Sequence, residues 1–179
     1  MLTLAAAFTL GALLVGGLVF AGTRASSTER TADRIRVEAA QRDKEQIKAL
    51  TELARTTCDR LVPVLDGLDR AMPADGSTRP AAVTSADVVG WRRAATAAVE
   101  AFADPPSGET ATNVARSSLA SAVRQITTTV DTYATSRALT GSTRETVVAL
   151  AVRQRADAIF TWSTGAIVFL DTARWRGAR

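Results

Sequence analysis

Residues 47–72, IKALTELARTTCDRLVPVLDGLDRAM, decide the fold of this chain because their apolar side chains recur every three or four positions. This spacing places them on one face of an α-helix, where they form a continuous stripe. The members of the stripe are Ile47, Leu50, Ala54, Cys58, Leu61, Leu65, Leu68 and Met72. Cys58, the sole cysteine, is expected to be a small buried apolar side chain rather than a nucleophile.

Three further stretches have the same periodicity and predict helices over residues 85–103, 109–137 and 142–175. Their stripes contain Val88, Trp91, Ala95, Val99 and Phe102; then Leu119, Ala122, Ile126, Val130 and Tyr133; then Val148, Val152, Ile159, Ala166 and Leu170, widened by Phe160, Trp162, Val168 and Phe169. Ser85 is the candidate N-cap of the first of these helices. Short connections favour antiparallel neighbours, so we expect an all-α fold with an antiparallel four-helix bundle over residues 47–179.

The N-terminal segment, residues 1–23, contains no charged side chain. Residues 2–21 read LTLAAAFTLGALLVGGLVFA, and twenty helical residues span roughly 30 Å, the thickness of a bilayer's hydrocarbon core. We therefore expect a transmembrane anchor at residues 1–23. A cleaved signal peptide is the alternative, because residues 19–21 offer a small-residue cleavage site, although the basic segment that precedes such a site is missing.

Residues 24–46 are strongly polar and predict a solvated helical stalk with oppositely charged side chains at helical spacing. The basic residues that flank the anchor, Arg24, Arg30, Arg34 and Arg36, all lie on its C-terminal side. Lysine and arginine near a span favour the cytoplasm, so these four residues are expected to determine topology and to place the bundle inside. An extracytoplasmic bundle remains the alternative.

The formal net charge of +4 comes from 22 basic and 18 acidic residues, and the excess lies near the anchor and in the last helix. An antiparallel bundle returns its last helix toward the membrane. The tail residues Arg174, Trp175, Arg176 and Arg179 are therefore candidates for contact with the membrane or with an acidic partner. The alternative is a frayed C-terminal tail without a partner, whose charged side chains keep it in solvent.

The absence of histidine and the single cysteine restrict the chemistry available to this chain. They exclude Ser-His-Asp and Cys-His catalysis, histidine-containing zinc sites and iron–sulfur clusters within one chain. Asp66 and Asp69 share a helix face, but Arg70 beside them favours surface ion pairing over catalysis. We therefore expect no catalytic residues, no metal, no cofactor and no enzymatic activity.

The order of an uncharged N-terminus, one span, an arginine-rich helix and further helices resembles that of single-pass bacterial scaffold proteins of the cell-division and cell-envelope type. This resemblance covers the layout and assigns no residue to a site. The leading hypothesis is a membrane-tethered helical scaffold or interaction module in the cytoplasm that binds a protein partner or itself. The alternatives are an extracytoplasmic adapter or sensor-like domain, and a membrane-anchored nucleic-acid-binding protein, for which basic residues interspersed with acids offer less support.

Overall fold

The computed structural model describes residues 27–75, 78–103 and 110–177, with the side chains of residues 110–111 and 168–177 left out. These residues form no strand and four helices: α2 (Ser27–Ala71), α3 (Ser85–Glu100), α4 (Thr110–Ser136) and α5 (Gly141–Gly177). The all-helical class is confirmed, and the arrangement is consistent with a helical bundle. None of the described helices is both long enough and apolar enough to cross a bilayer. The expected anchor at residues 1–23 lies outside the described residues.

The chain divides into two compact units, Met1–Arg42 and Asp43–Arg179. In the first unit, the described residues 27–42 form the N-terminal portion of α2, and their charged side chains are exposed to solvent. Arg36 forms an ion pair with Asp33 one turn earlier, at 3.0 Å. Exposed pairs of this kind support a solvated helix modestly. The stalk limits expected at residues 24 and 46 stay a prediction.

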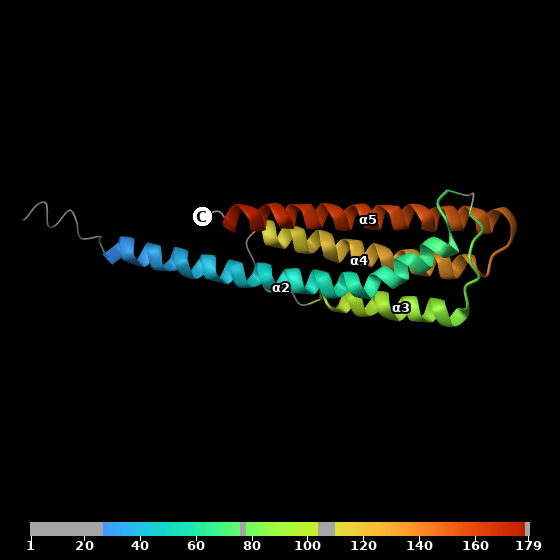
Figure 1. The fold of residues 1–179 in the computed structure, drawn as a ribbon, viewed down its shortest axis with the longest axis horizontal. Coiled ribbons are helices and arrows are strands. Elements are labelled where there is room, and N and C mark those ends of the chain that lie inside the picture. Colours follow the sequence, from blue (N-terminus) through green and yellow to red (C-terminus); the bar gives the residue numbers. More distant parts are fainter. Residues whose placement is uncertain (1–26, 76–77, 104–109, 178–179) are drawn as a thin grey trace, which may run out of the picture. The chain divides into compact units, whose positions relative to one another are not determined.

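In the second unit, consecutive helices run in opposite directions (Figure 1). The core takes Leu50, Leu61, Val64 and Leu68 from α2, Val88, Ala95 and Ala98 from α3, and Leu119, Val123, Ile126, Val130 and Tyr133 from α4. The stripes expected for α3 and α4 are confirmed, since each of their members is buried or half-buried. The core is therefore built largely from residues that the three-or-four spacing identified.

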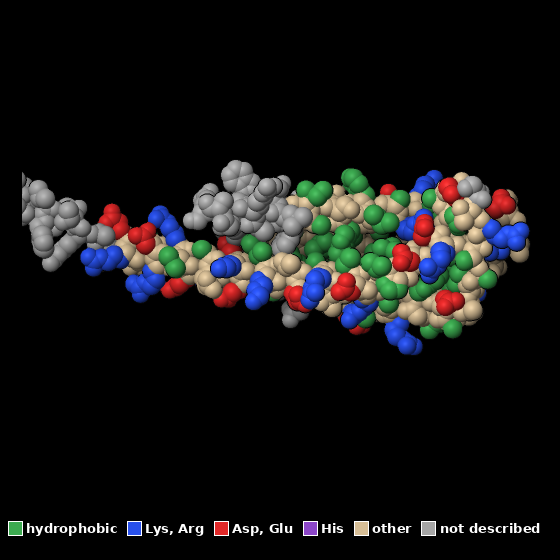
Figure 2. Space-filling view, viewed as in Figure 1, with side chains coloured by type: hydrophobic (Ala, Val, Ile, Leu, Met, Phe, Trp, Pro, Cys, Tyr) green, Lys and Arg blue, Asp and Glu red, His purple; other side chains and the backbone are tan. Residues whose placement is uncertain are grey.

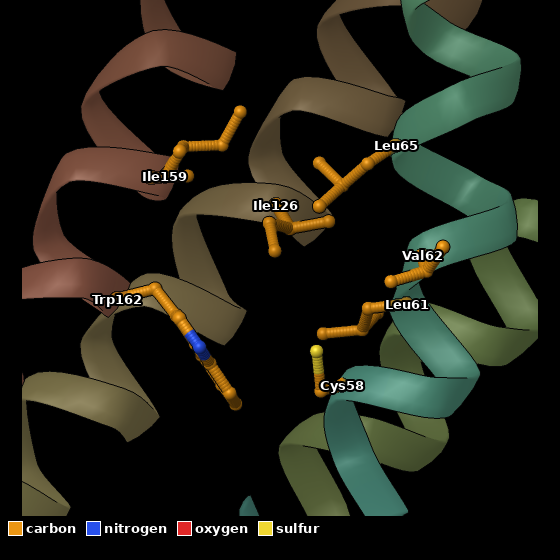
Figure 3. Close-up of a pocket in the computed structure, with 8 residues that line it drawn as sticks. Cys58, Leu61, Val62, Leu65, Ile126, Ile159 and Trp162 are labelled. Carbon is orange, nitrogen blue, oxygen red and sulfur yellow. The ribbon is translucent and has the colours of Figure 1, made fainter. Parts of the chain in front are cut away.

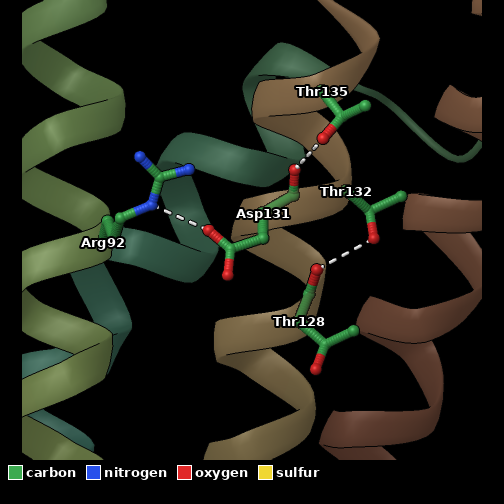
Figure 4. Close-up of polar contacts among 5 residues, drawn as sticks. All are labelled: Arg92, Thr128, Asp131, Thr132 and Thr135. Atoms are coloured by element: carbon green, nitrogen blue, oxygen red, sulfur yellow. Dashed lines mark hydrogen bonds and ion pairs between the residues drawn. The ribbon is translucent and has the colours of Figure 1, made fainter.

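Threonine hydroxyls in α4, both in the core and on the surface, donate to backbone carbonyls of the preceding turn. Thr129 is fully buried, and its hydroxyl donates to the carbonyl of Gln125 at 2.8 Å. Thr132 and Thr135 donate in the same way to carbonyls one turn earlier (Figure 4). A buried hydroxyl without a partner costs about 1–3 kcal/mol. These bonds explain how a helix rich in threonine keeps its place in the core.

A capping box fixes the beginning of α3. The Thr84 hydroxyl accepts the backbone N–H of Asp87 at 3.1 Å, and the Asp87 carboxylate accepts the backbone N–H of Thr84 at 2.8 Å. The cap is therefore Thr84 rather than Ser85, because Asp87 lies three residues after Thr84 and can return the hydrogen bond. Hydrogen bonds from the Thr84 hydroxyl and backbone lower the pKa of the Asp87 carboxyl below its ordinary value.

Trp91 of α3 packs directly over Gly67 of α2. A Cβ atom added at Gly67 would lie 2.4 Å from Cζ2 of the Trp91 ring, so only glycine permits this approach. The ring also lies beside Tyr133 of α4, with centroids 5.9 Å apart. Burial beside these groups raises the pKa of the Tyr133 phenol. One indole thus joins three helices at this end of the unit.

The core face of α5 differs from the expected one. Ala151 and Ala158 are fully buried, and Gly165 lies against α4, where an added Cβ would come within 2.9 Å of a serine Cβ. These small residues recur every seven positions and let the two helices approach closely. The expectation that Ile159 and Phe160 face the core was wrong, since they are 47% and 74% exposed. Small residues make the closest contact with α4, whereas Val148, Val152 and Trp162 of the expected face do pack against the core.

We expect Gly67→Ala to lower the free energy of unfolding and Gly90→Ala to raise it. Both glycines lie inside helices, where alanine gains up to about 1 kcal/mol. At Gly67 the new methyl group meets the Trp91 ring, and overpacking of about 1–3 kcal/mol outweighs that gain. At Gly90 nothing lies within 4 Å of an added Cβ. Urea unfolding followed by circular dichroism measures both changes, and equal signs would contradict the packing.

Candidate functional site

An apolar groove lies between α2 and α5, with α4 at its floor (Figure 3). Its lining residues are Cys58, Leu61, Val62 and Leu65 of α2, Ile126 of α4, and Ala158, Ile159 and Trp162 of α5. The side chains of α2 and α5 extend toward each other from opposite sides, and Ile126 lies between them (Figure 3). The groove encloses a volume of about 90 Å³. Apart from a thiol and an indole N–H, its side chains offer only hydrocarbon.

The groove exists because α2 stays farther from α5 than α4 does. The backbones of α4 and α5 approach closely, as do those of α3 and α4. Within the described ranges, α2 has no comparably close backbone approach to another helix. Its longer side chains therefore span only part of the gap. Cys58 lies at this gap and is half-buried, whereas its sequence position predicted full burial.

Arg155 of α5 holds α2 in place one turn beyond the groove. Its Nη2 atom lies 2.7 Å from Oδ1 of Asp69, and its Nη1 donates to the carbonyl of Met72 at 3.3 Å. The Arg155 side chain is 7% exposed and that of Asp69 is 68% exposed, so mainly the arginine is desolvated. The surface ion pairing expected for Asp69 thus occurs with Arg155 of a distant helix rather than with its neighbour Arg70.

The α5 side of the groove carries no charge. The sequence has no charged residue between Asp157 and Asp171, and in this interval Ile159, Phe160 and Ile167 are 47%, 74% and 61% exposed. Apolar side chains fill the hollow between α2 and α5 and continue along the outer edge of α5 (Figure 2). A helix that is apolar on all sides is usually covered on all sides. This stretch of α5 therefore presents apolar surface beside the groove.

By contrast, α2 has charged side chains on its solvent-facing side. Arg55 forms an ion pair with Glu52 at 2.9 Å, and both side chains are more than half exposed. The hydrogen bond from the Arg55 guanidinium holds the pKa of the Glu52 carboxyl below its usual value. The two sides of the groove thus differ in chemistry, one charged and the other uncharged.

A second hollow lies between α4 and α5 and is polar and open to solvent. It is lined by Asn113, Val114, Ser117, Ser118, Ser121 and Thr161. None of these side chains titrates near neutral pH. Its hydroxyl groups can exchange hydrogen bonds with water. This hollow is therefore better suited to contact with solvent than the apolar groove is.

A polar contact ties α3 to α4 on another face of the unit. Arg92 Nε donates to Oδ1 of Asp131 at 2.7 Å, and both side chains are about half exposed (Figure 4). The Arg137 guanidinium donates to the carbonyls of Val83 and Thr84 at 3.0 and 3.1 Å. These contacts position α3 and lie away from the groove residues.

The residues expected to act at a membrane fall mostly outside the described side chains. Arg30, Arg34 and Arg36 are exposed on α2, and Arg24 precedes the described residues. The tail candidates are Arg174, Trp175 and Arg176, whose side chains are not described, and Arg179, which lies beyond the described range. Their contact with a membrane or an acidic partner stays a prediction. In the part of the chain that the structure describes, no group of three or more His, Cys, Asp or Glu is placed to hold a metal ion.

Sequence reasoning missed the groove although its signal is visible in the sequence. Residues 158–170 carry no charge, which by itself is typical of a helix buried within a bundle. The alanine and glycine positions 151, 158 and 165 are the signal that places the large side chains of this stretch outside. A search for small residues at seven-residue spacing would have identified the exposed face.

Comparison of the chain with protein-family models, with curated proteins and with solved structures gives no match. The function of the groove is therefore inferred from the residues and contacts of this chain.

We expect Asp69→Asn to lower the free energy of unfolding by about 1–2 kcal/mol, because a neutral amide can accept a hydrogen bond from the buried Arg155 guanidinium but no longer compensates its charge. The matched control is Asp131→Asn, which breaks an ion pair that is half exposed on both sides. Such pairs contribute about 0–1 kcal/mol. Urea unfolding of the two variants measures the difference. A smaller effect at Asp69 than at Asp131 would contradict the role assigned to Arg155.

Proposed function

We propose that this protein is a non-enzymatic, membrane-tethered helical interaction module that docks a helical protein surface in the cytoplasm. The observation that carries the proposal is the apolar groove between α2 and α5, which Ile159 lines, together with the exposed Phe160 and Ile167 elsewhere on the same stretch of α5. An amphipathic helix that lies in such a groove buries its apolar side chains at helical spacing. The groove offers this kind of surface over more than one helical turn.

The energetics favour a contact of moderate strength. Covering a large exposed apolar side chain contributes about 1.5–3 kcal/mol. Among the described side chains of the second unit, Phe160 and Ile167 are the most exposed large apolar ones. Association itself costs several kcal/mol in lost translational and rotational freedom. A few side chains of this kind therefore give a reversible contact, which confinement to a membrane would strengthen by raising the effective concentration.

The sequence of the N-terminal region supports the membrane tether. Residues 1–23 are uncharged and long enough for one span in contact with lipid. Arg24, Arg30, Arg34 and Arg36 follow it and favour a cytoplasmic bundle. The tether would hold the groove in a fixed compartment, so the partners are membrane-associated or cytoplasmic proteins, or further copies of this chain.

We expect a photoreactive benzoyl-phenylalanine that replaces Phe160 to crosslink a protein when membranes of expressing cells are illuminated. Phe160 is 74% exposed and follows Ile159 of the groove in the sequence, so an aromatic analogue there samples whatever covers this stretch of α5 without disturbing the core. The matched control carries the same group in place of Val89, a half-exposed apolar residue of α3 away from the groove. The measurement is the mass and sequence of the adducts.

A discrete protein adduct at position 160 that is absent at position 89 is the expected result. Adducts with lipid alone, or equal protein adducts at both positions, would show that the groove side of α5 is no protein-docking surface.

The topology of the proposed module is tested with two reporters, each fused after Arg179 in a separate full-length chain. One is active only outside the cytoplasm, and the other fluoresces only inside it. The basic residues after the anchor predict fluorescence without external activity. External activity would transfer the module to the other side of the membrane. Exchanging the four arginines at positions 24, 30, 34 and 36 for glutamine is expected to weaken the internal bias.

A further inference from the structure

We propose that the helix that docks in the groove is a basic amphipathic one, whose lysine or arginine side chains pair with Asp59 and Asp66 along the α2 edge of the opening. This inference rests on the proposed function and states the chemistry of the partner. Three observations support it: two exposed carboxylates beside the groove, a shortage of basic side chains on the same edge, and a proline that adds a hydrogen-bond acceptor next to one of the carboxylates.

Asp59 and Asp66 lie on the same side of α2 as the groove residue Val62. Asp59 precedes Val62 by three positions and Asp66 follows it by four, and helix residues at these spacings are neighbours on the surface. Both acidic residues are exposed, and Val62 is 45% exposed. Seven residues of helix rise by about 10 Å, so the two charges border the opening over two turns. The edge of α2 is therefore apolar toward the hollow and acidic beside it.

The basic residues of this part of α2 do not balance its acids. Arg55 forms its ion pair with Glu52, and its pKa is raised first by the hydrogen bond to Glu52 and then by the charges of Glu52 and Asp59. Arg60 lies two positions before Val62, and helix residues two apart do not face the same way. One guanidinium on this edge thus serves two carboxylates.

Asp66 has no cation of its own. Among the described side chains none forms an ion pair with it, and Arg70, four residues on, does not reach it. The next acid, Asp69, differs because Arg155 lies 2.7 Å from its carboxylate. Asp157, the exposed residue that precedes the uncharged stretch of α5, is an acid as well. Such an opening attracts a cationic partner and repels an anionic surface.

Pro63 adds a hydrogen-bond acceptor beside Asp59. It lies inside α2, and a proline has no backbone N–H to donate to the carbonyl four residues earlier, which is that of Asp59. Pro63 is itself exposed. The carboxylate and this carbonyl belong to one residue, and an ammonium or guanidinium group carries several N–H donors and no acceptor. A lysine or arginine side chain can therefore serve both oxygens.

The hollow receives the apolar face of the same partner helix. Trp162 lies across it from Cys58 and Leu61 (Figure 3), and these side chains offer hydrocarbon to an entering apolar group. A helix docked in a groove anchors itself through apolar side chains at positions i, i+3 or i+4, and i+7. Basic residues seven positions apart on its flank match the two carboxylates, because both helices rise by the same distance per residue. The partner is thus apolar on one face and basic on the flank toward α2.

Two synthetic helical peptides test this pairing. They share one leucine stripe and differ only in whether lysine or glutamate occupies the flanking positions. The full-length protein is held in nanodiscs of zwitterionic phosphatidylcholine, and empty nanodiscs correct for binding to lipid. Fluorescence anisotropy measures the Kd, and the maleimide labelling rate of Cys58, which lines the hollow, reports whether the groove is covered. We expect the lysine peptide to bind about tenfold more tightly, to slow the labelling of Cys58 and to lose affinity as salt is added.

Charge variants of the protein test the two carboxylates directly. Asp59→Asn combined with Asp66→Asn is expected to weaken binding of the lysine peptide about tenfold, the effect of losing two exposed ion pairs. Asp59→Lys combined with Asp66→Lys is expected to reverse the preference in favour of the glutamate peptide. The matched control is Glu100→Gln combined with Glu145→Gln, which removes the same charge from exposed residues outside the groove lining and is expected to change neither readout.

The inference is overturned if the two peptides bind equally, or if the double asparagine variant binds the lysine peptide as tightly as the control does. Equal protection of Cys58 by both peptides would leave the groove as a helix-docking site and remove only its selectivity for charge. Tight binding of the lysine peptide without protection of Cys58 would place the peptide elsewhere and would also overturn the inference. If neither peptide protects Cys58, the proposed function fails with it.

Discussion

The close packing of α5 on α4 is the contact on which the rest of the second unit depends. Ala151, Ala158 and Gly165 present almost no side chain, so the two backbones come together where larger residues would hold them apart. Because these small residues face α4, Ile159 and Phe160 lie on other sides of α5 and are exposed. The apolar surface beside the groove is therefore a direct result of how the buried face of α5 is made.

The position of α2 is set by fewer and more widely separated contacts. The indole of Trp91 lies on Gly67, and the guanidinium of Arg155 reaches Asp69 and the Met72 carbonyl. The contacted residues Gly67, Asp69 and Met72 lie in the last turns of α2 or just after it. Farther back along the helix, the contact with α5 passes through long apolar side chains that leave the hollow at Cys58. The groove thus lies along the part of α2 that precedes the contacts of Trp91 and Arg155.

The sequence predicts the helical class and the buried faces of α3 and α4 well, because large apolar residues recur there at helical spacing. It predicts α5 only in part: Val148, Val152 and Trp162 pack against the core as expected, but a pattern of large side chains overlooks the alanine and glycine positions that face α4. The partner of Asp69 could not be predicted either, since a helix pattern gives no distance between Asp69 and Arg155. The groove depends on the separation of two helices, and that separation is fixed by packing throughout the unit rather than by a local motif.

The way in which α2 is held has a mechanical consequence. Near its C-terminal end α2 is joined to α5 by the contacts of Arg155, and farther back it is held by buried apolar side chains without a close approach of the two backbones. The distance between α2 and α5 at Cys58 is therefore a softer coordinate than the distance between α4 and α5, which bare backbones determine. A change in the distance between α2 and α5 would widen or narrow the hollow. The aperture can adjust to its occupant, while the α4–α5 pair keeps its shape.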